Sequence, residues 1–142
     1  MLVTIHTDGG SLGNPGPSAV GVVIEYDGQK KTYGKDIGVG TNNEAEYKAL
    51  VFALRKTKAL LGGAVAKKAE LKCFMDSQLV ESQLNHKYHL KNERTTKFFV
   101  EIWNLMLEFK SVQFNYIPRE ENQEADGLIR EVYKTFDQKT LF

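Results

Sequence analysis

The stretch LVTIHTDGGSLGNPG, residues 2–16, determines how we expect the chain to begin its fold. Its first seven residues place apolar side chains on both faces of an extended backbone, which is typical of a strand in the middle of a sheet. Asp8 ends this run, and glycines and prolines then interrupt regular structure for about ten residues. We therefore expect a central strand over residues 2–8 with a carboxylate at its carboxyl end.

Two further strands are predicted immediately after this loop. Residues 19–26 and 31–37 have the composition of strands, and the Asp27-Gly28 pair between them is a strong hairpin signal. Three consecutive strands joined by short loops predict an antiparallel meander.

A long helix follows the meander. Thr41 and Glu44 match a capping box, with Asn43 and Glu46 as an overlapping alternative, and Gly62-Gly63 ends the helical pattern. Glu46 falls at the inner edge of the apolar stripe, an unusual place for a carboxylate that has no function.

The second half of the chain alternates strands with helices. A strand over residues 70–75 is closed by Asp76, Ser77 is placed to cap a short helix, and Asn92 to cap a longer one. The last predicted strand contains Val112, Phe114 and Tyr116 and is stopped by Pro118. A final helix follows, with inward-facing residues Ala125, Leu128, Ile129 and Val132. The tail, residues 134–142, either packs on the domain or frays. Helical crossovers imply parallel strands, whose carboxyl ends meet at one edge of an α/β sheet.

Four carboxylates stand at strand ends or in early helical turns: Asp8, Glu46, Asp76 and Asp126. A fold that brings these ends together gathers four acids at one point, where like charges raise each other's pKa. A divalent cation between them relieves this repulsion, and oxygen ligands favour Mg²⁺ or Mn²⁺. The pattern predicts the metal site of a nuclease.

Bulk composition is that of one globular domain, residues 1–142, with 42% hydrophobic and 26% charged residues. No apolar run approaches the roughly 18–20 residues of a membrane span, and no signal peptide is visible. The single cysteine, Cys73, fits a reducing cytoplasm. The net charge of +1 does not decide whether the partner is a polyanion, although residues 86–97 are locally basic. That stretch is equally consistent with a solvated polar loop.

Four motifs in this order resemble those of type 1 ribonuclease H, ribonuclease HI, over nearly the whole chain. They are D-G-G-S-L-G-N-P-G from Asp8, T-N-N-E-A-E from Thr41, D-S-Q from Asp76 and R-E-E-N-Q-E-A-D from Arg119. The resemblance implies an α/β ribonuclease H-like fold, with a five-stranded mixed sheet of strand order 3-2-1-4-5 flanked by helices. It also implies an endonuclease that hydrolyses the RNA strand of RNA–DNA hybrids, leaving 5′-phosphate and 3′-hydroxyl ends.

The same resemblance assigns roles to the acids. Asp8 would bridge two Mg²⁺ ions, and Mn²⁺ could substitute for them. Glu46 and Asp76 would hold the ion on the leaving-group side, and Asp126 would hold the ion that activates water. The substrate contacts that it implies are Gly9, Gly10, Ser11, Asn14, Thr41, Asn42, Asn43, Gln78 and Asn92. Among these, Asn14, Asn42, Asn43 and Gln78 would read 2′-hydroxyls or bases. Thr41 and Asn92 would hold a DNA-strand phosphate. Helix capping is the alternative role for Asn43 and Asn92.

Two departures from many relatives place the chain in an archaeal and bacterial subset. The loop before the last acid lacks a histidine and carries Arg119, whose guanidinium cannot act as a general base but can stabilise phosphate charge. The basic helical protrusion that grips the hybrid is also missing, which predicts modest affinity and distributive cleavage. We expect a cytoplasmic monomer without an obligate protein partner or a membrane.

Two other functions remain open from the sequence. The same site could act on double-stranded RNA as well, because relatives without the protrusion sometimes do. A hybrid-binding module that has lost catalysis is the other alternative, which the presence of all four acids disfavours.

Overall fold

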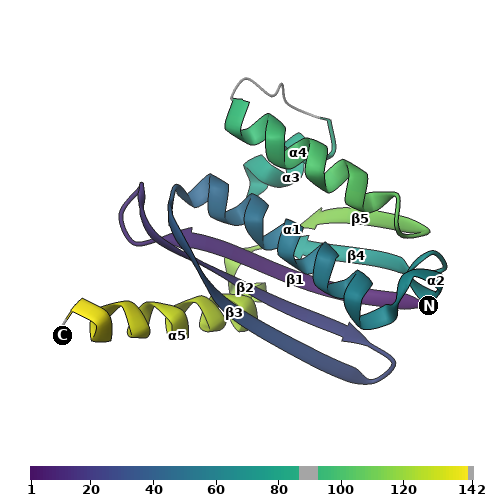
Figure 1. Ribbon diagram of the computed structural model, residues 1–142, viewed down its shortest axis with the longest axis horizontal. Coiled ribbons are helices and arrows are strands. Elements are labelled where there is room, and N and C mark those ends of the chain that lie inside the picture. The colour runs from purple at the N-terminus through teal and green to yellow at the C-terminus, as the bar shows by residue number, and fades with distance from the viewer. Residues whose placement is uncertain (87–92, 141–142) are drawn as a thin grey trace.

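The computed structural model describes residues 1–86 and 93–140 as a five-stranded sheet covered by helices on both faces (Figure 1). The strands are β1 (Leu2–Ser11), β2 (Gly16–Tyr26), β3 (Gln29–Gly40), β4 (Glu70–Met75) and β5 (Ser111–Tyr116). The helices are α1 (Asn42–Leu61), α2 (Gly63–Ala66), α3 (Gln78–Leu84), α4 (Glu93–Met106), the 3₁₀ turn η1 (Arg119–Glu121) and α5 (Gln123–Thr140).

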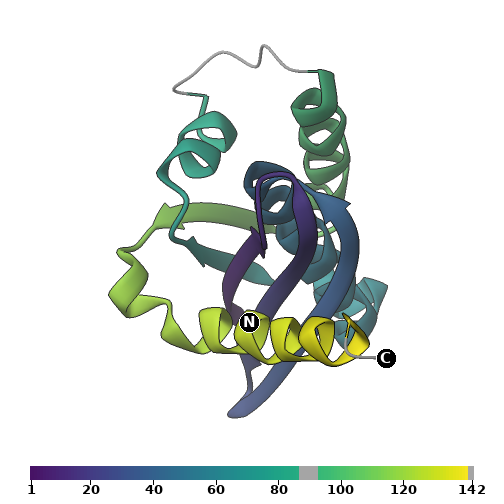
Figure 2. The same cartoon turned by 90° about the vertical axis from the view of Figure 1, so that its left-hand side faces the viewer.

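The sheet has the strand order β3-β2-β1-β4-β5, which confirms the predicted ribonuclease H-like topology. β1, β2 and β3 pair antiparallel as the meander, and β4 and β5 add in parallel on the other side of β1. β1 is therefore central, as its apolar pattern predicted. Figure 2 shows α5 on one face of the sheet and α1 with α4 on the other.

The first loop is shorter than predicted. Gly9 and Gly10 do not end the strand but continue β1 in register with Val20 and Ala19, and β2 already begins at Gly16. Glycine weakens a strand only through its lost entropy and missing side chain, and here neighbouring elements occupy the side-chain space. A Cβ on Gly9 would lie 2.3 Å from the carbonyl oxygen of Ala45 in α1.

The predicted helix ends and hairpin are found where expected. Thr41 caps α1 by accepting a hydrogen bond from the Glu44 amide, at 3.1 Å, so the first of the two overlapping caps is used. Ser77 caps α3 by accepting from the Val80 amide. The hairpin turn contains Asp27 and Gly28, both at positive φ. The predicted cap Asn92 lies outside the described residues.

The core lies mainly between the sheet and the helices α1, α3 and α4. Its largest fully buried side chains include Tyr47, Leu50, Leu54 and Ile102. On the opposite face, α5 buries Ala125 and Ile129 against the meander, and its helix runs on to Thr140 through most of the segment 134–142. This packing fixes the amino-terminal ends of α1 and α5 close to the central strand. Among the described residues, no helix combines the length and apolarity needed to cross a bilayer.

Candidate active site

The predicted acids meet in a pocket of about 360 Å³ near the carboxyl ends of β1 and β4. It is lined by Asp8, Gly9, Gly10, Asn42, Asn43, Glu46, Asp76, Ser77, Arg119, Asp126, Ile129 and Tyr133. These residues come from both halves of the chain, and all four predicted metal ligands are among them.

Three of the acids form a tight cluster. Asp8 from β1, Glu46 from the second turn of α1, and Asp76 after β4 each offer a carboxylate oxygen, and these atoms lie within 4.8 Å of one another. The close contact of Gly9 with α1 makes this possible, because it brings the first turns of the helix against the central strand.

The acids of this cluster have raised pKa values. Burial raises the pKa of Asp8 to about 7, and the charge of Asp76 adds to the effect. Burial and then the charge of Asp8 raise the pKa of Glu46 well above its ordinary value. Burial also raises the pKa of Asp76, although a hydrogen bond from Asn122 and the charge of Arg119 oppose this shift. Ionising the whole cluster therefore requires a compensating positive charge.

Asp126 is not part of this tight cluster. It lines the same pocket, but its carboxylate is not among the atoms that cluster within 4.8 Å. Instead its Oδ2 is 2.5 Å from Nη2 of Arg130, one helical turn further along α5.

A buried asparagine, Asn122, forms a hydrogen bond with the carboxylate of Asp76. The Nδ2 of Asn122 donates to the backbone oxygen of Thr7 at 2.9 Å and to Oδ2 of Asp76 at 3.4 Å. Asn122 is 1% exposed, so it ties the end of β4 to the central strand inside the protein. Sequence reasoning missed this residue, although it stands inside the R-E-E-N-Q-E-A-D motif.

The predicted substrate residues divide into three groups. Gly9, Gly10, Asn42 and Asn43 line the acidic pocket. Asn14 and Thr41 line an adjoining pocket, which also includes Asn42 and Asn43. Gln78 is exposed at the start of α3 and Ser11 is half-buried at the end of β1, and neither lines either pocket; Asn92 lies outside the described residues.

Asn42 connects these two pockets. The side-chain oxygen of Asn42 accepts a hydrogen bond from the backbone N–H of Ser11 at 2.9 Å. The backbone N–H of Asn42 donates to Oδ1 of Asn14 at 3.0 Å. The adjoining pocket also contains Arg94, which pairs with Glu44 at 3.4 Å. Arg94 and Tyr133 also line these pockets, but the motifs did not indicate them. Arg94 lies on α4, outside every motif, and Tyr133 lies on α5 beyond the end of the last motif at Asp126.

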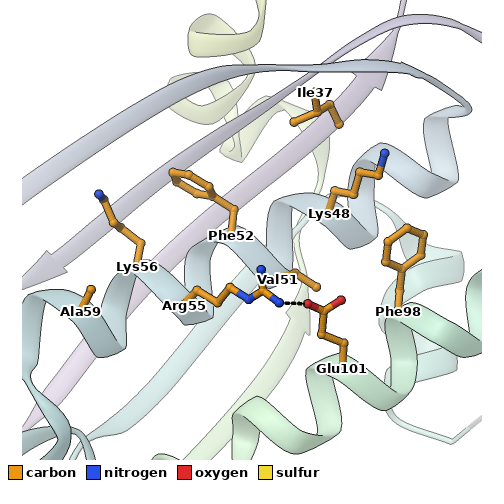
Figure 3. A pocket seen from close by; sticks show the side chains of 9 residues that line it. All are labelled: Ile37, Lys48, Val51, Phe52, Arg55, Lys56, Ala59, Phe98 and Glu101. Atoms are coloured by element: carbon orange, nitrogen blue, oxygen red, sulfur yellow. Dashed lines mark hydrogen bonds and ion pairs between the residues drawn. The ribbon is translucent and has the colours of Figure 1, made fainter.

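A larger pocket, of about 560 Å³, lies between α1 and α4 (Figure 3). Its walls are apolar and basic, including Phe52, Phe98 and Lys48, and an ion pair between Arg55 and Glu101 crosses it. Among the described residues, none of those predicted for the site lines it. The carboxylate cluster therefore places the candidate active site in the smaller pocket.

The donor set of the cluster fits hard divalent cations. Three carboxylates converge, their pKa values are raised by burial and mutual repulsion, and a cation of charge +2 would reverse that penalty. Oxygen ligands alone, without cysteine or histidine, suit Mg²⁺ or Mn²⁺ better than Zn²⁺.

Comparison with known proteins agrees with this arrangement. Residues 6–132 match the model of a family described as reverse transcriptase-like. The ribonuclease HI of Halobacterium salinarum is 37% identical over 131 residues, which cover 91% of this chain and 63% of that protein. The bifunctional protein Rv2228c of Mycobacterium tuberculosis is 34% identical, over 90% of this chain and 34% of that protein. The chain thus spans between about a third and two thirds of the length of these curated relatives.

Solved structures extend the comparison to the whole fold. The crystal structure of ribonuclease H1 from Halobacterium salinarum has a TM-score of 0.85 at 35% identity, and covers 95% of this chain and 99% of that one. LC11-RNase H1, solved in complex with an RNA/DNA hybrid, has a TM-score of 0.84 at 36% identity, and covers 91% of this chain and 94% of that one. The sequence motifs, the sheet topology and these similarities together show that the chain belongs to the type 1 ribonuclease H family.

Proposed function

We propose that this chain is an endonuclease that hydrolyses the RNA strand of RNA–DNA hybrids and leaves 5′-phosphate and 3′-hydroxyl ends. The observation that carries the proposal is the cluster of Asp8, Glu46 and Asp76 within 4.8 Å, in a pocket that Asp126 and Arg119 also line. Family membership supports it, as does the hybrid bound to LC11-RNase H1.

The metal ligands in this proposal are Asp8, Glu46, Asp76 and Asp126, and the ions are two Mg²⁺, with Mn²⁺ as a substitute. Bound divalent cations would lower the pKa of an attacking water and neutralise the charge that develops on the leaving 3′-oxygen. The fold contributes by holding the first three carboxylates close together, where they can bind the ions, and the hydrogen bond from Asn122 orients Asp76.

Arg119 supplies the fixed positive charge of the pocket. It lines the same pocket as Asp76, and its charge favours the ionised form of that carboxylate. In our proposal it also stabilises negative charge on the phosphate during cleavage, a role for which a guanidinium is suited and a neutral side chain is not.

The substrate contacts in the proposal are the two asparagine positions that reach both pockets, Asn42 and Asn43, together with the backbone at Gly9, Gly10 and Ser11. Asn14 and Gln78 are further proposed contacts with the hybrid, and Thr41 and Asn92 are proposed for a DNA-strand phosphate. Amide groups can read 2′-hydroxyls, which distinguish RNA from DNA. The side chain of Thr41 also caps α1, so this residue would serve both roles.

We also assign the chain to the subset of the family that lacks the basic protrusion and the loop histidine. With fewer phosphate contacts, it should release the hybrid after each cut. We further propose that it acts as a monomer.

The experiment that tests the proposed function compares four labelled duplexes of one sequence: RNA–DNA with label on either strand, RNA–RNA, and DNA–DNA. We expect Mg²⁺-dependent cleavage of the labelled RNA in the hybrid, no cleavage in excess EDTA, and intact DNA in all cases. Cleavage of RNA–RNA at a comparable rate would broaden the substrate class. Intact hybrid in Mg²⁺ and in Mn²⁺ would contradict the proposal and favour a binding module.

A further inference from the structure

Among the described residues, the hydroxyl of Tyr133 has no hydrogen-bond partner in the pocket that this residue lines. Tyr133 lies on α5, seven residues after Asp126, so the two share one face of the helix. Both line the pocket that contains the acid cluster. Within residues 1–86 and 93–136, its hydroxyl forms no hydrogen bond with any other group.

The backbone of the central strand determines where the Tyr133 hydroxyl lies. A Cβ on Gly10 would be 2.7 Å from this oxygen, so the phenol occupies the space that a side chain at position 10 would need. Its ring also packs against that of Phe136, at 5.8 Å between centroids. The hydroxyl is therefore held against the strand that also carries Asp8.

The surrounding charges make this hydroxyl a hydrogen-bond donor. Burial, and then the charges of Asp8, Asp126 and Glu46, raise the pKa of Tyr133. The phenol thus stays protonated at neutral pH. Four carboxylates line this pocket and repel an anionic oxygen, so an unpartnered neutral donor beside them suits a phosphate oxygen.

We infer that Tyr133 is a substrate-contacting residue that donates its hydroxyl hydrogen to a phosphate oxygen of the RNA strand beside the bond that is cut. This inference rests on the proposed function, which places the scissile phosphodiester at the acid cluster. The pocket measures only about 360 Å³, so a phosphate held by the cluster or the one next to it comes within reach of a donor on the same wall. Gly10 keeps the path between donor and phosphate open.

The test is the substitution Tyr133→Phe, which keeps the ring and removes only the hydroxyl. Hybrid binding is measured in the Asp8→Asn background, so that no cleavage occurs, and steady-state cleavage is measured with Asp8 intact. We expect hybrid affinity to fall by roughly ten- to a hundredfold, as for one hydrogen bond to a charged acceptor. Because the contact forms already in the bound ground state, KM should rise by a similar factor with kcat little changed.

Two controls distinguish a phosphate contact from a structural effect. Tyr26→Phe removes a hydroxyl from a half-buried tyrosine at the hairpin end of β2, and should leave both Kd and KM unchanged. Since the phenol is uncharged, Tyr133→Phe should lower the affinity by one factor at every salt concentration and leave the salt slope unaltered. Equal hybrid affinity and KM in Tyr133→Phe and the unaltered protein would overturn the inference.

A second variant tests the position of the hydroxyl. Gly10→Ala should push the phenol aside, and its binding loss should be less than additive with that of Tyr133→Phe in a double-mutant cycle. Fully additive losses would contradict the inference. If the unaltered protein fails to cut hybrids yet still binds them, the binding cycle alone decides the role of Tyr133, so failure of the proposed function is seen separately.

Discussion

Asp126 and Arg130 form an ion pair on α5, with 2.5 Å between Oδ2 and Nη2. The arginine side chain is 73% exposed and the aspartate side chain 25%, so the pair stands at the rim of the pocket. A divalent cation that uses Asp126 must compete with this guanidinium for the carboxylate. If Asp126 is a metal ligand as proposed, Arg130 should modulate how readily this fourth acid joins the other three.

We predict that Arg130→Gln lowers the Mg²⁺ concentration needed for half-maximal activity by up to about fivefold, because an exposed ion pair is worth at most about 1 kcal/mol. A Mg²⁺ titration of cleavage at constant ionic strength measures this. Lys134→Gln is the matched control, since it breaks the exposed pair with Glu131 on the same helix and removes the same charge. Equal shifts in the two variants would show a general charge effect and refute the competition.

The acid cluster should also make the stability of the metal-free protein depend on pH. The pKa of Asp8 is raised to about 7 in the folded protein, so between its unfolded value near 4 and pH 7 the folded state binds more protons than the unfolded state. The free energy of unfolding should therefore fall as the pH rises through this window and stay level above it.

Asp8→Asn removes the main part of this penalty. We expect the variant to be more stable than the unaltered protein by on the order of 1–3 kcal/mol at pH 8, and by little at pH 4. Urea denaturation in EDTA at both pH values measures the difference. A stability gain that is equal at the two pH values would show that Asp8 is not held at a raised pKa.

Asn122 contributes to both stability and the site. Asn122→Ala removes two hydrogen bonds of a residue that is 1% exposed, and leaves the Thr7 carbonyl without its donor. We predict a loss of about 1–3 kcal/mol in the free energy of unfolding and slower cleavage at saturating Mg²⁺. Asn104→Ala, on the exposed side of α4, should change stability by less than about 0.5 kcal/mol. If cleavage by Asn122→Ala is unaffected once the protein is folded, Asn122 does not orient Asp76.

Arg119 should affect turnover more than folding. Arg119→Ala is expected to lower kcat by about ten- to a thousandfold, on the order of one lost contact to developing charge. Arg119→Lys should restore part of this, because the charge returns without the planar geometry. The side chain is exposed, so thermal unfolding should be nearly unchanged. An unaltered kcat in Arg119→Ala would reduce Arg119 to a loop residue.

Much of the architecture could be predicted from the sequence because its signals are local. Thr41, Ser77 and the Asp27-Gly28 turn each act on the backbone within a few residues, and the helical crossovers determine which strand ends meet. The path of β1 past Gly9 was not predictable, because a glycine that ends a strand and one that admits a neighbouring helix look alike in sequence.

The site was predictable to the extent that chemistry is carried by motifs. The clustering of Asp8, Glu46 and Asp76 followed from strand ends and helix starts. The ion pair of Asp126 with Arg130 did not follow in this way, since it depends on side-chain orientation along α5. Nor could Tyr133 be identified, because its contact with Gly10 joins residues more than a hundred positions apart.

The central claim is that the cluster of Asp8, Glu46 and Asp76 binds divalent cations, and calorimetric titration with Mg²⁺ tests it most directly. We predict that the unaltered protein binds Mg²⁺ and that Asp8→Asn loses most of this binding. Glu81→Gln should retain it, because Glu81 is a buried acid of α3 outside the pocket. Mg²⁺ binding that is equally strong in the unaltered protein and in Asp8→Asn would contradict the account.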